Sequence, residues 1–355
     1  METMYSAVYD DCSRELQLPI RDVPGSESWT SVKTIQHGDS TDRKFKVKDQ
    51  NGNRYMIRLL DKTRYDHGKF ACRLMDMLYQ NKVPVPCPAS FGVCDQNRSV
   101  YLMTHWIYGK PAPERLPEHH ETVQYLLGQE TAVYLHALHG CEAPTGPDLW
   151  AQKICQQIDQ VQATCSDADK DLSCVNSLLQ FVLDNAHIVG QQPQRVLHGD
   201  LTPANLIFSY ETSVSLIDFE KWQFGDPLAD LTPIMTDFSH ISSRFATGFL
   251  DCYFHYQTDV RTFRCLAFYA ALRRLQQYAA ACAAGEMARQ LAIQDVRQLV
   301  KDYSGFSTVV PVWYRVMPQM KEQTKNRNGR KSKKSLDDMR RSEPGQVPGQ
   351  LAGQC

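Results

Sequence analysis

The sequence from Val196 to Phe208 reads Val-Leu-His-Gly-Asp-Leu-Thr-Pro-Ala-Asn-Leu-Ile-Phe. Two apolar runs enclose a polar loop, and this pattern predicts two short strands joined by the loop. The loop carries His198, Asp200 and Asn205. Because a loop tied to strands at both ends is held in place, these residues are candidates for a functional site.

A second apolar run, Val-Ser-Leu-Ile at residues 214–217, follows a polar turn and ends at Asp218. We expect the oxygen atoms of Asp200, Asn205 and Asp218 to converge. Such a set suits phosphoryl transfer, in which one carboxylate orients a hydroxyl and accepts its proton while an amide and a second carboxylate hold magnesium. A purely structural interpretation, in which Asp200 caps a turn and Asn205 begins a strand, leaves their joint placement unexplained.

These motifs resemble those of the aminoglycoside phosphotransferase and choline kinase family, relatives of the protein kinases. Its members carry His-Gly-Asp-x-x-x-x-Asn and a later strand that ends in Asp-Phe or Asp-Trp, which stand here at residues 198–205 and 218–219. The resemblance implies an α+β, two-lobed, protein-kinase-like fold with a small antiparallel-sheet N-lobe that holds one helix and a larger, mainly helical C-lobe. It implies ATP or GTP and Mg2+ as cofactors, Asp200 as the catalytic residue, and Asn205 and Asp218 as metal ligands.

Composition fits this interpretation. The chain has 355 residues, of which 42% are hydrophobic and 22% charged, and a net charge of −1. A core large enough for two lobes is expected, and the charge argues against nucleic-acid binding. Since no apolar run approaches the roughly 18 residues of a membrane span and the cysteines are scattered, we expect a cytoplasmic protein with reduced thiols. The oligomeric state is left open.

We expect an N-terminal extension over residues 1–28, a nucleotide-binding N-lobe over 29–104, a catalytic and acceptor-binding C-lobe over 105–320, and a disordered basic tail over 321–355. The tail has almost no large apolar residues, so it cannot offset the entropy of ordering. Apolar periodicity predicts the main helices. They are expected at residues 65–81, 121–139, 149–163, 172–187, 245–257, 261–284 and 288–303.

Nucleotide contacts follow from the resemblance. A Gly-containing loop with Gly38, Ser40 and Thr41 would cover the phosphates, and Arg58 would bind them as the cation. Hinge residues 104–108, represented by Thr104 and Trp106, would meet the adenine edge through their backbone.

One position departs from the family. The helix at residues 65–81 should supply a glutamate that orients the phosphate-binding cation, but the matching positions hold Ala71 and Arg73. Three alternatives are open: Asp66 or Asp76 substitutes, Arg58 is held differently, or the nucleotide site is weakened.

Two residues are expected to be structural. The family pattern makes Asp226 of Gly-Asp-Pro the brace of the catalytic segment and the start of a helix, and makes His198 a brace of its own loop. A metal site at His136, His139 and Cys141 is rejected because no fourth ligand stands nearby.

The predicted function is transfer of the γ-phosphoryl group of ATP to a hydroxyl of a small molecule. An aminoglycoside-like or amino-sugar acceptor is the first choice, and a choline, ethanolamine or homoserine-type acceptor is the alternative. A polycation would need an acidic pocket, and a choline-type acceptor would need an aromatic cage. The acidic candidates are Glu220, Asp226, Asp230 and Asp237, and the aromatic ones are Trp222, Trp313 and Tyr314. A catalytically silent kinase-like binding module is the alternative from another class.

Overall fold

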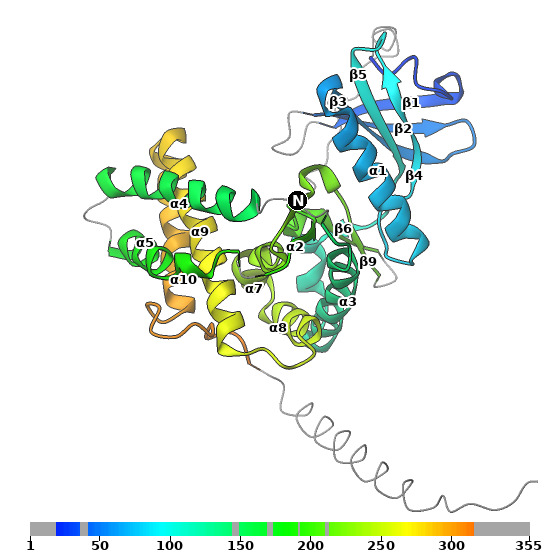
Figure 1. Ribbon diagram of the computed structural model, residues 1–355. Helices are drawn as coiled ribbons and strands as arrows, with labels where there is room; N and C mark the ends of the chain where they lie inside the picture. The colour runs from blue at the N-terminus through cyan, green and yellow to red at the C-terminus, as the bar shows by residue number, and fades with distance from the viewer. Residues whose placement is uncertain are drawn as a thin grey trace, which may run out of the picture. The chain divides into compact units, whose positions relative to one another are not determined.

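The structure is a computed structural model that describes residues 19–35, 42–143, 149–168, 173–190, 192–209 and 213–315. The glycine loop with Gly38, Ser40 and Thr41 lies outside the described residues, as does the tail predicted over 321–355. The N-terminal part holds a five-stranded sheet and one long helix, and the remainder is mainly helical (Figure 1).

The N-terminal sheet is antiparallel, with the strand order β1-β2-β3-β5-β4. Its strands are β1 (Trp29–Ile35), β2 (Arg43–Asp49), β3 (Arg54–Asp61), β4 (Pro88–Cys94) and β5 (Ser99–His105). A tight turn joins β2 to β3, as the Asn51-Gly52 pair predicts. Gly52 has φ of +86°, and the Asp49 carboxylate accepts from the Asn51 and Asn53 amides. The register places Lys44 opposite Arg58.

Helix α1 (Tyr65–Gln80) packs on the sheet through Ala71, Leu74, Met75 and Leu78, which are buried. These positions recur at helical spacing, which explains why the segment forms an amphipathic helix. The other face of the sheet buries Phe45, Val47 and Ile57 together with Ile20 and Val23. Residues 19–28, predicted as part of an extension, therefore help to cover the sheet.

The C-terminal part is mainly helical, and its longer helices have bounds close to those that the periodicity predicts. They are α2 (Ala112–Arg115), α3 (Glu121–His139), α4 (Leu149–Ala168), α5 (Ser173–Asn185), α6 (Pro227–Asp230), a π-helical turn (Ile234–Phe238), α7 (Ser239–Ile241), α8 (Ser243–Tyr253), α9 (Val260–Ala284) and α10 (Glu286–Asp302). Helices α3 and α8 cross closely because Gly128 and Gly248 lie at the contact, where an added Cβ would lie 2.1 Å from a backbone oxygen of the other helix.

Two small sheets support the polar loop that begins at His198. Strand β7 (Arg195–Leu197) pairs with β10 (Gln223–Gly225), and β8 (Leu206–Phe208) lies between β6 (Lys110–Pro111) and β9 (Val214–Leu216). All are antiparallel pairs. The apolar runs on both sides of the loop are therefore strands, as predicted.

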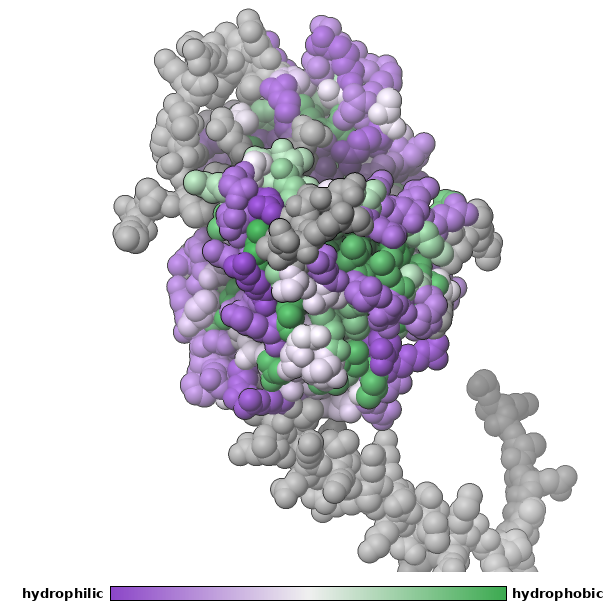
Figure 2. Space-filling model, turned by 90° about the vertical axis from the view of Figure 1, so that its left-hand side faces the viewer, coloured by the Kyte–Doolittle hydropathy of each residue, from purple (hydrophilic) through white to green (hydrophobic). Residues whose placement is uncertain are grey.

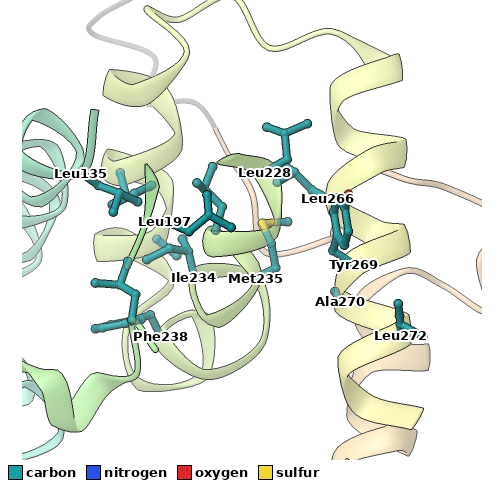
Figure 3. Close-up of a cluster of buried hydrophobic side chains, with 14 of the residues drawn as sticks. Leu135, Leu197, Leu228, Ile234, Met235, Phe238, Leu266, Tyr269, Ala270 and Leu272 are labelled. Carbon is teal, nitrogen blue, oxygen red and sulfur yellow. The ribbon is translucent and has the colours of Figure 1, made fainter. Parts of the chain in front are cut away.

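The helical core beneath these strands is continuous. Figure 3 shows side chains from five elements of this core lying together. They are Leu135 of α3, Leu197 of β7, Leu228 of α6, Ile234, Met235 and Phe238 of the π-helical turn, and Leu266, Tyr269 and Ala270 of α9. This packing fixes the base on which the polar loop stands.

The surface mixes polar and apolar residues. On the face in Figure 2, hydrophobic residues gather in the lower central part, among hydrophilic ones. No helix within the described ranges combines the length and the apolar character needed to cross a membrane.

Candidate active site

The loop at residues 198–205 is held by a buried histidine. His198 Nε2 donates to the Ile217 carbonyl at 3.0 Å, and its Nδ1 accepts from the Asp200 amide at 3.3 Å. Burial lowers the pKa of His198, although the nearby carboxylates oppose this effect, and the hydrogen bond that Nδ1 accepts requires a neutral ring. One ring nitrogen donates and the other accepts, which makes His198 a brace of the loop, in agreement with the prediction.

The second brace is Asp230, and here the prediction was wrong. The Asp230 carboxylate accepts from the backbone amides of His198 at 2.5 Å and Gly199 at 2.9 Å, and it pairs with His139 Nε2 at 3.1 Å. Burial alone would raise the pKa of Asp230, but His139 and these amides hold it below its ordinary value. Asp230 thus satisfies buried amides that would otherwise lack acceptors.

Asp226, the predicted brace, has other partners. It caps α6 by accepting from the Leu228 amide at 2.9 Å, as expected for a residue that starts a helix, and it accepts from the Tyr269 hydroxyl at 2.8 Å. Asp226 therefore starts the helix, while Asp230, one turn later, braces the loop.

Gly199 can only be glycine. Its φ is +77°, and a Cβ atom there would lie 1.9 Å from the carbonyl oxygen of Lys221. A side chain would be excluded both by the left-handed backbone and by this contact. The close approach of the two segments brings Lys221 next to Asp200.

Asp200 and Asn205 form one hydrogen-bonded unit. The Asn205 side-chain nitrogen donates to the Asp200 carbonyl at 2.8 Å and to its carboxylate at 3.3 Å. Lys221 Nζ lies 3.0 Å from the same carboxylate oxygen, Asp200 Oδ2. Since its nitrogen is used in this way, the amide oxygen is the group that Asn205 can offer to a cation.

Asp218 follows β9 and is tied to the same unit. The Ile217 amide donates to the Asn205 carbonyl at 3.0 Å, and Asp218 itself adopts a left-handed conformation with φ of +69°. Its carboxylate pairs with Lys44 Nζ at 3.0 Å and Arg58 Nη2 at 2.5 Å. Burial alone would raise the pKa of Asp218, but Arg58 and Lys44 hold it below its ordinary value.

Arg58 is also held by acids that the sequence analysis did not assign to it. Its Nη1 forms an ion pair with Glu220 and lies 3.7 Å from Asp42 Oδ2. Arg64 Nη1 joins the same group, at 2.9 Å from Asp42 and 3.5 Å from Glu220. Of the three alternatives for the missing helix glutamate, the geometry favours the one in which Arg58 is held differently.

The hinge candidates lie at the end of β5. Thr104 is buried and stands opposite Met56 of β3 and Pro88 of β4. The Trp106 amide donates to the Arg54 carbonyl at 2.9 Å, and the Trp106 ring lies 4.0 Å from Lys46 Nζ. Their contact with adenine stays a prediction.

The four acids considered for an acceptor pocket do not form one. Glu220 pairs with Arg58 and Arg64, Asp226 and Asp230 hold the backbone, and Asp237 pairs with Arg273 and Arg274. The aromatic candidates are also divided. Trp222 stacks on Phe70 of α1, whereas Tyr314 packs on Phe263 and donates to Asp251.

Three charged residues near the predicted catalytic set were missed, namely Asp42, Lys44 and Lys221, and Glu220 was considered only as part of an acidic acceptor pocket. Lys44 carried a partial signal, because a β2 strand paired with β3 would put a lysine near Arg58, although the register decides which lysine. The partners of Glu220 and Asp42 are distant in sequence and depend on the fold.

Comparison with known proteins identifies the fold. Residues 31–269 match the phosphotransferase enzyme family. A thermostable mutant of aminoglycoside phosphotransferase APH(4)-Ia, in its apo form, is similar with a TM-score of 0.58 and 18% identity, over 82% of this chain and 100% of that chain. A mutant of aminoglycoside 2'-phosphotransferase-IIIa in complex with GDP has a TM-score of 0.62 and 14% identity, over 81% and 97%.

Amicoumacin kinase hAmiN, in complex with AMP-PNP, Ca2+ and Ami, has a TM-score of 0.55 and 13% identity, over 78% of this chain and 90% of that chain. A search of curated protein sequences finds no match. At these identities the solved structures show the fold, and they confirm the predicted two-lobed kinase-like architecture. Because the family match spans more than half of the sequence, the chain belongs to the phosphotransferase enzyme family.

Proposed function

We propose that the protein transfers the γ-phosphoryl group of ATP to a hydroxyl of a small molecule. One observation carries the proposal: hydrogen bonds of Asn205 and of the Ile217 amide link the segments that hold Asp200, Asn205 and Asp218, and two cations from the N-terminal sheet reach Asp218. Carboxylates, an amide and phosphate-binding cations are the groups that phosphoryl transfer requires.

Asp200 is the proposed catalytic residue. Its carboxylate is fixed by Asn205 and Lys221 and its side chain is 22% exposed, so an acceptor hydroxyl can reach it. There Asp200 would orient the hydroxyl and accept its proton. Because the transition state of phosphoryl transfer is loose, orientation of the two reactants contributes more than the strength of the base.

The proposed metal ligands are Asn205 and Asp218, and their chemistry fits magnesium. An amide oxygen and an ionised carboxylate suit a hard cation that keeps water and phosphate oxygens as its other ligands. The described part of the chain holds no group of three or more His, Cys, Asp and Glu side chains arranged as a metal site. When bound, magnesium would neutralise charge on the transferred phosphate.

The proposed nucleotide contacts come from the N-terminal sheet, from the loop with Gly38 and from the hinge. Arg58 and Lys44 lie opposite each other on β3 and β2 and would meet the phosphate oxygens. The proposed cover of the phosphates is the loop with Gly38, Ser40 and Thr41, and the proposed adenine contacts are the hinge residues Thr104 and Trp106. The proposed boundary between the lobes falls at this hinge, between residues 104 and 105.

The acceptor is a small molecule with a hydroxyl, and an aminoglycoside-like or amino-sugar acceptor is the finer form of the proposal. The similarity in fold to aminoglycoside phosphotransferases supports it. The side chains that contact the Asp200 carboxylate are cationic or neutral: Lys221 pairs with it, and the Asn205 amide donates to it. Neutral and anionic hydroxyl compounds therefore belong in any test.

The test is phosphate transfer from γ-labelled ATP with magnesium to a panel of aminoglycosides, macrolides, choline, ethanolamine, homoserine and sugar acids, for the wild type and Asp200→Ala. We expect transfer to one class of acceptor, with a rate lowered by about 1,000-fold or more in the variant. Equal transfer by both proteins would overturn the role of Asp200. A failure of the wild type to bind ATP would favour the silent binding module.

A further inference from the structure

We propose that Glu220, the second residue after Asp218, holds Arg58 in position for the nucleotide phosphates, and that helix α1 acts on Arg58 only through Glu220. This role rests on the proposed function. It would make Glu220 a positioning residue that takes the place of an acid on the helix.

The contacts of Arg58 support this role. The guanidinium forks, with Nη1 on Glu220 and Nη2 on Asp218, and the Arg58 and Glu220 side chains are only 12% and 11% exposed. A guanidinium removed from water in this way needs acidic partners. Asp42 adds a weaker contact at 3.7 Å, and Arg64 binds both Asp42 and Glu220 from the other side.

Helix α1 offers no acid that pairs with Arg58 among the residues that the structure describes. Ala71, one of the two positions matched to the family glutamate, is 4% exposed and buried. Asp66 and Asp76 are exposed, and neither forms an ion pair with any residue that the structure describes. The helix therefore cannot hold Arg58 directly.

The helix instead positions the backbone around Glu220. His67 Nε2 donates to the Glu220 carbonyl at 2.6 Å, and the Trp222 indole donates to the His67 carbonyl at 3.2 Å. The Trp222 ring also stacks on Phe70 at 3.9 Å between ring centroids. Because α1 fixes residues 220–222 in this way, its position determines where the Glu220 side chain meets Arg58.

The two terminal nitrogen atoms of the Arg58 guanidinium have different roles in this proposal. Nη1 stays with Glu220, while Nη2, now on Asp218, can exchange that carboxylate for a phosphate oxygen when a nucleotide arrives. A lysine would have to serve both partners from one nitrogen atom, whereas each nitrogen of the guanidinium fork can have a partner of its own. Arginine at this position and glutamate two residues after Asp218 thus form a matched pair.

The experiment compares Glu220→Gln and Glu220→Asp with two control variants on the helix, Asp66→Asn and Asp76→Asn. The dissociation constant of ATP is measured by calorimetry with and without magnesium, and KM for ATP and kcat are measured with the best acceptor. We expect Glu220→Gln to weaken ATP binding by about tenfold in both conditions, because Arg58 loses its anchor whether or not metal is present. Glu220→Asp should recover part of the affinity, and the helix controls should change it less than about twofold.

Two results would overturn the inference. Unchanged ATP affinity in Glu220→Gln, or an equal loss in Asp66→Asn, would show that another group holds Arg58. A loss confined to magnesium-containing samples would make Glu220 a metal ligand instead.

A double-mutant cycle of Arg58→Gln with Glu220→Gln, read by unfolding without nucleotide, separates this inference from the proposed function. We expect the effects on unfolding to be non-additive for this pair and additive for Arg58→Gln with Asp66→Asn. If the wild type does not bind ATP, the proposed function fails, while additive behaviour of Arg58 with Glu220 would overturn the anchor itself.

Discussion

Replacing Asp218 by asparagine should cost stability as well as activity, because the change leaves a buried lysine without a charged partner. Lys44 Nζ lies 3.0 Å from Asp218 Oδ2, and the two side chains are 10% and 16% exposed. Within the described ranges Lys44 forms no other ion pair, whereas Arg58 keeps Glu220. The variant Asp218→Asn therefore leaves Lys44 without an acidic partner, whereas Arg58 retains one.

The size of the effect follows from this burial. Removing one partner of a fully buried ion pair costs about 3–5 kcal/mol. The small exposure of both side chains, and the amide oxygen that asparagine can still offer to Lys44, reduce the expected loss to about 2–3 kcal/mol. For a chain of this size that loss corresponds to a fall in Tm of about 3–5 °C.

The assay is thermal unfolding of the nucleotide-free protein, with Asp200→Asn as the matched control. Asp200 also pairs with a lysine, but Lys221 is 50% exposed, so the control should change stability by less than about 1 kcal/mol. Both variants should lose phosphate transfer, and only Asp218→Asn should lose stability. Adding Lys44→Met to Asp218→Asn should restore much of the Tm without restoring transfer. Equal Tm values for Asp218→Asn and Asp200→Asn would refute the reasoning.

Three further predictions concern the same region. Arg58 and Lys44 hold the pKa of Asp218 low against the effect of burial, so the ionised carboxylate stabilises the folded state above the unfolded pKa of about 3.9. This stabilisation is lost as the pH falls through the lower pKa of the folded state. Between about pH 5 and pH 2, Tm should therefore fall more steeply in the wild type than in Asp218→Asn. Gly199→Ala should lower the free energy of unfolding by about 2 kcal/mol or more, as measured with denaturant, because its Cβ would meet the Lys221 carbonyl at 1.9 Å; a variant as stable as the wild type would contradict this packing. Asp230→Asn should reduce kcat about tenfold or more with little change in ATP affinity, since it disturbs the amides of the loop but not the phosphate contacts. Steady-state kinetics would measure kcat and calorimetry would measure ATP affinity; a loss of affinity with kcat unchanged would contradict this prediction.

The sequence was sufficient where the determining interactions are local. Apolar runs on both sides of the loop predicted β7 and β8, and helical periodicity predicted α3 and α9 nearly to their ends, because burial of a regular stripe decides each element. The role of His198 as a brace came from the resemblance to the family and not from a local pattern, and the structure agrees with it.

Sequence reasoning failed where the partner is chosen by tertiary structure. Asp226 and Asp230 lie one helical turn apart and both are buried, so only the packing of α6 decides which one meets the amides of the loop. Arg58 and Glu220 are separated by 162 positions in the chain, and no periodicity links them.

The register between β2 and β3 could not be predicted from the sequence either. A two-residue turn at Asn51-Gly52 would place Lys44 opposite Leu59, but four residues, 50–53, separate the strands and the observed register places Lys44 opposite Arg58. Pairs facing each other across two strands depend on such details, so Lys44 could not be assigned to the site from its sequence position alone.

The central claim is that Asp200, Asn205 and Asp218 serve magnesium-dependent phosphate transfer in separate roles. It is tested most directly by calorimetric titration of ATP, with and without magnesium, into the wild type, Asp200→Ala and Asp218→Ala. We expect magnesium to tighten ATP binding to the wild type and to Asp200→Ala alike, and to have little effect on Asp218→Ala. ATP binding that is absent from the wild type, or an effect of magnesium that persists in Asp218→Ala, would contradict the account.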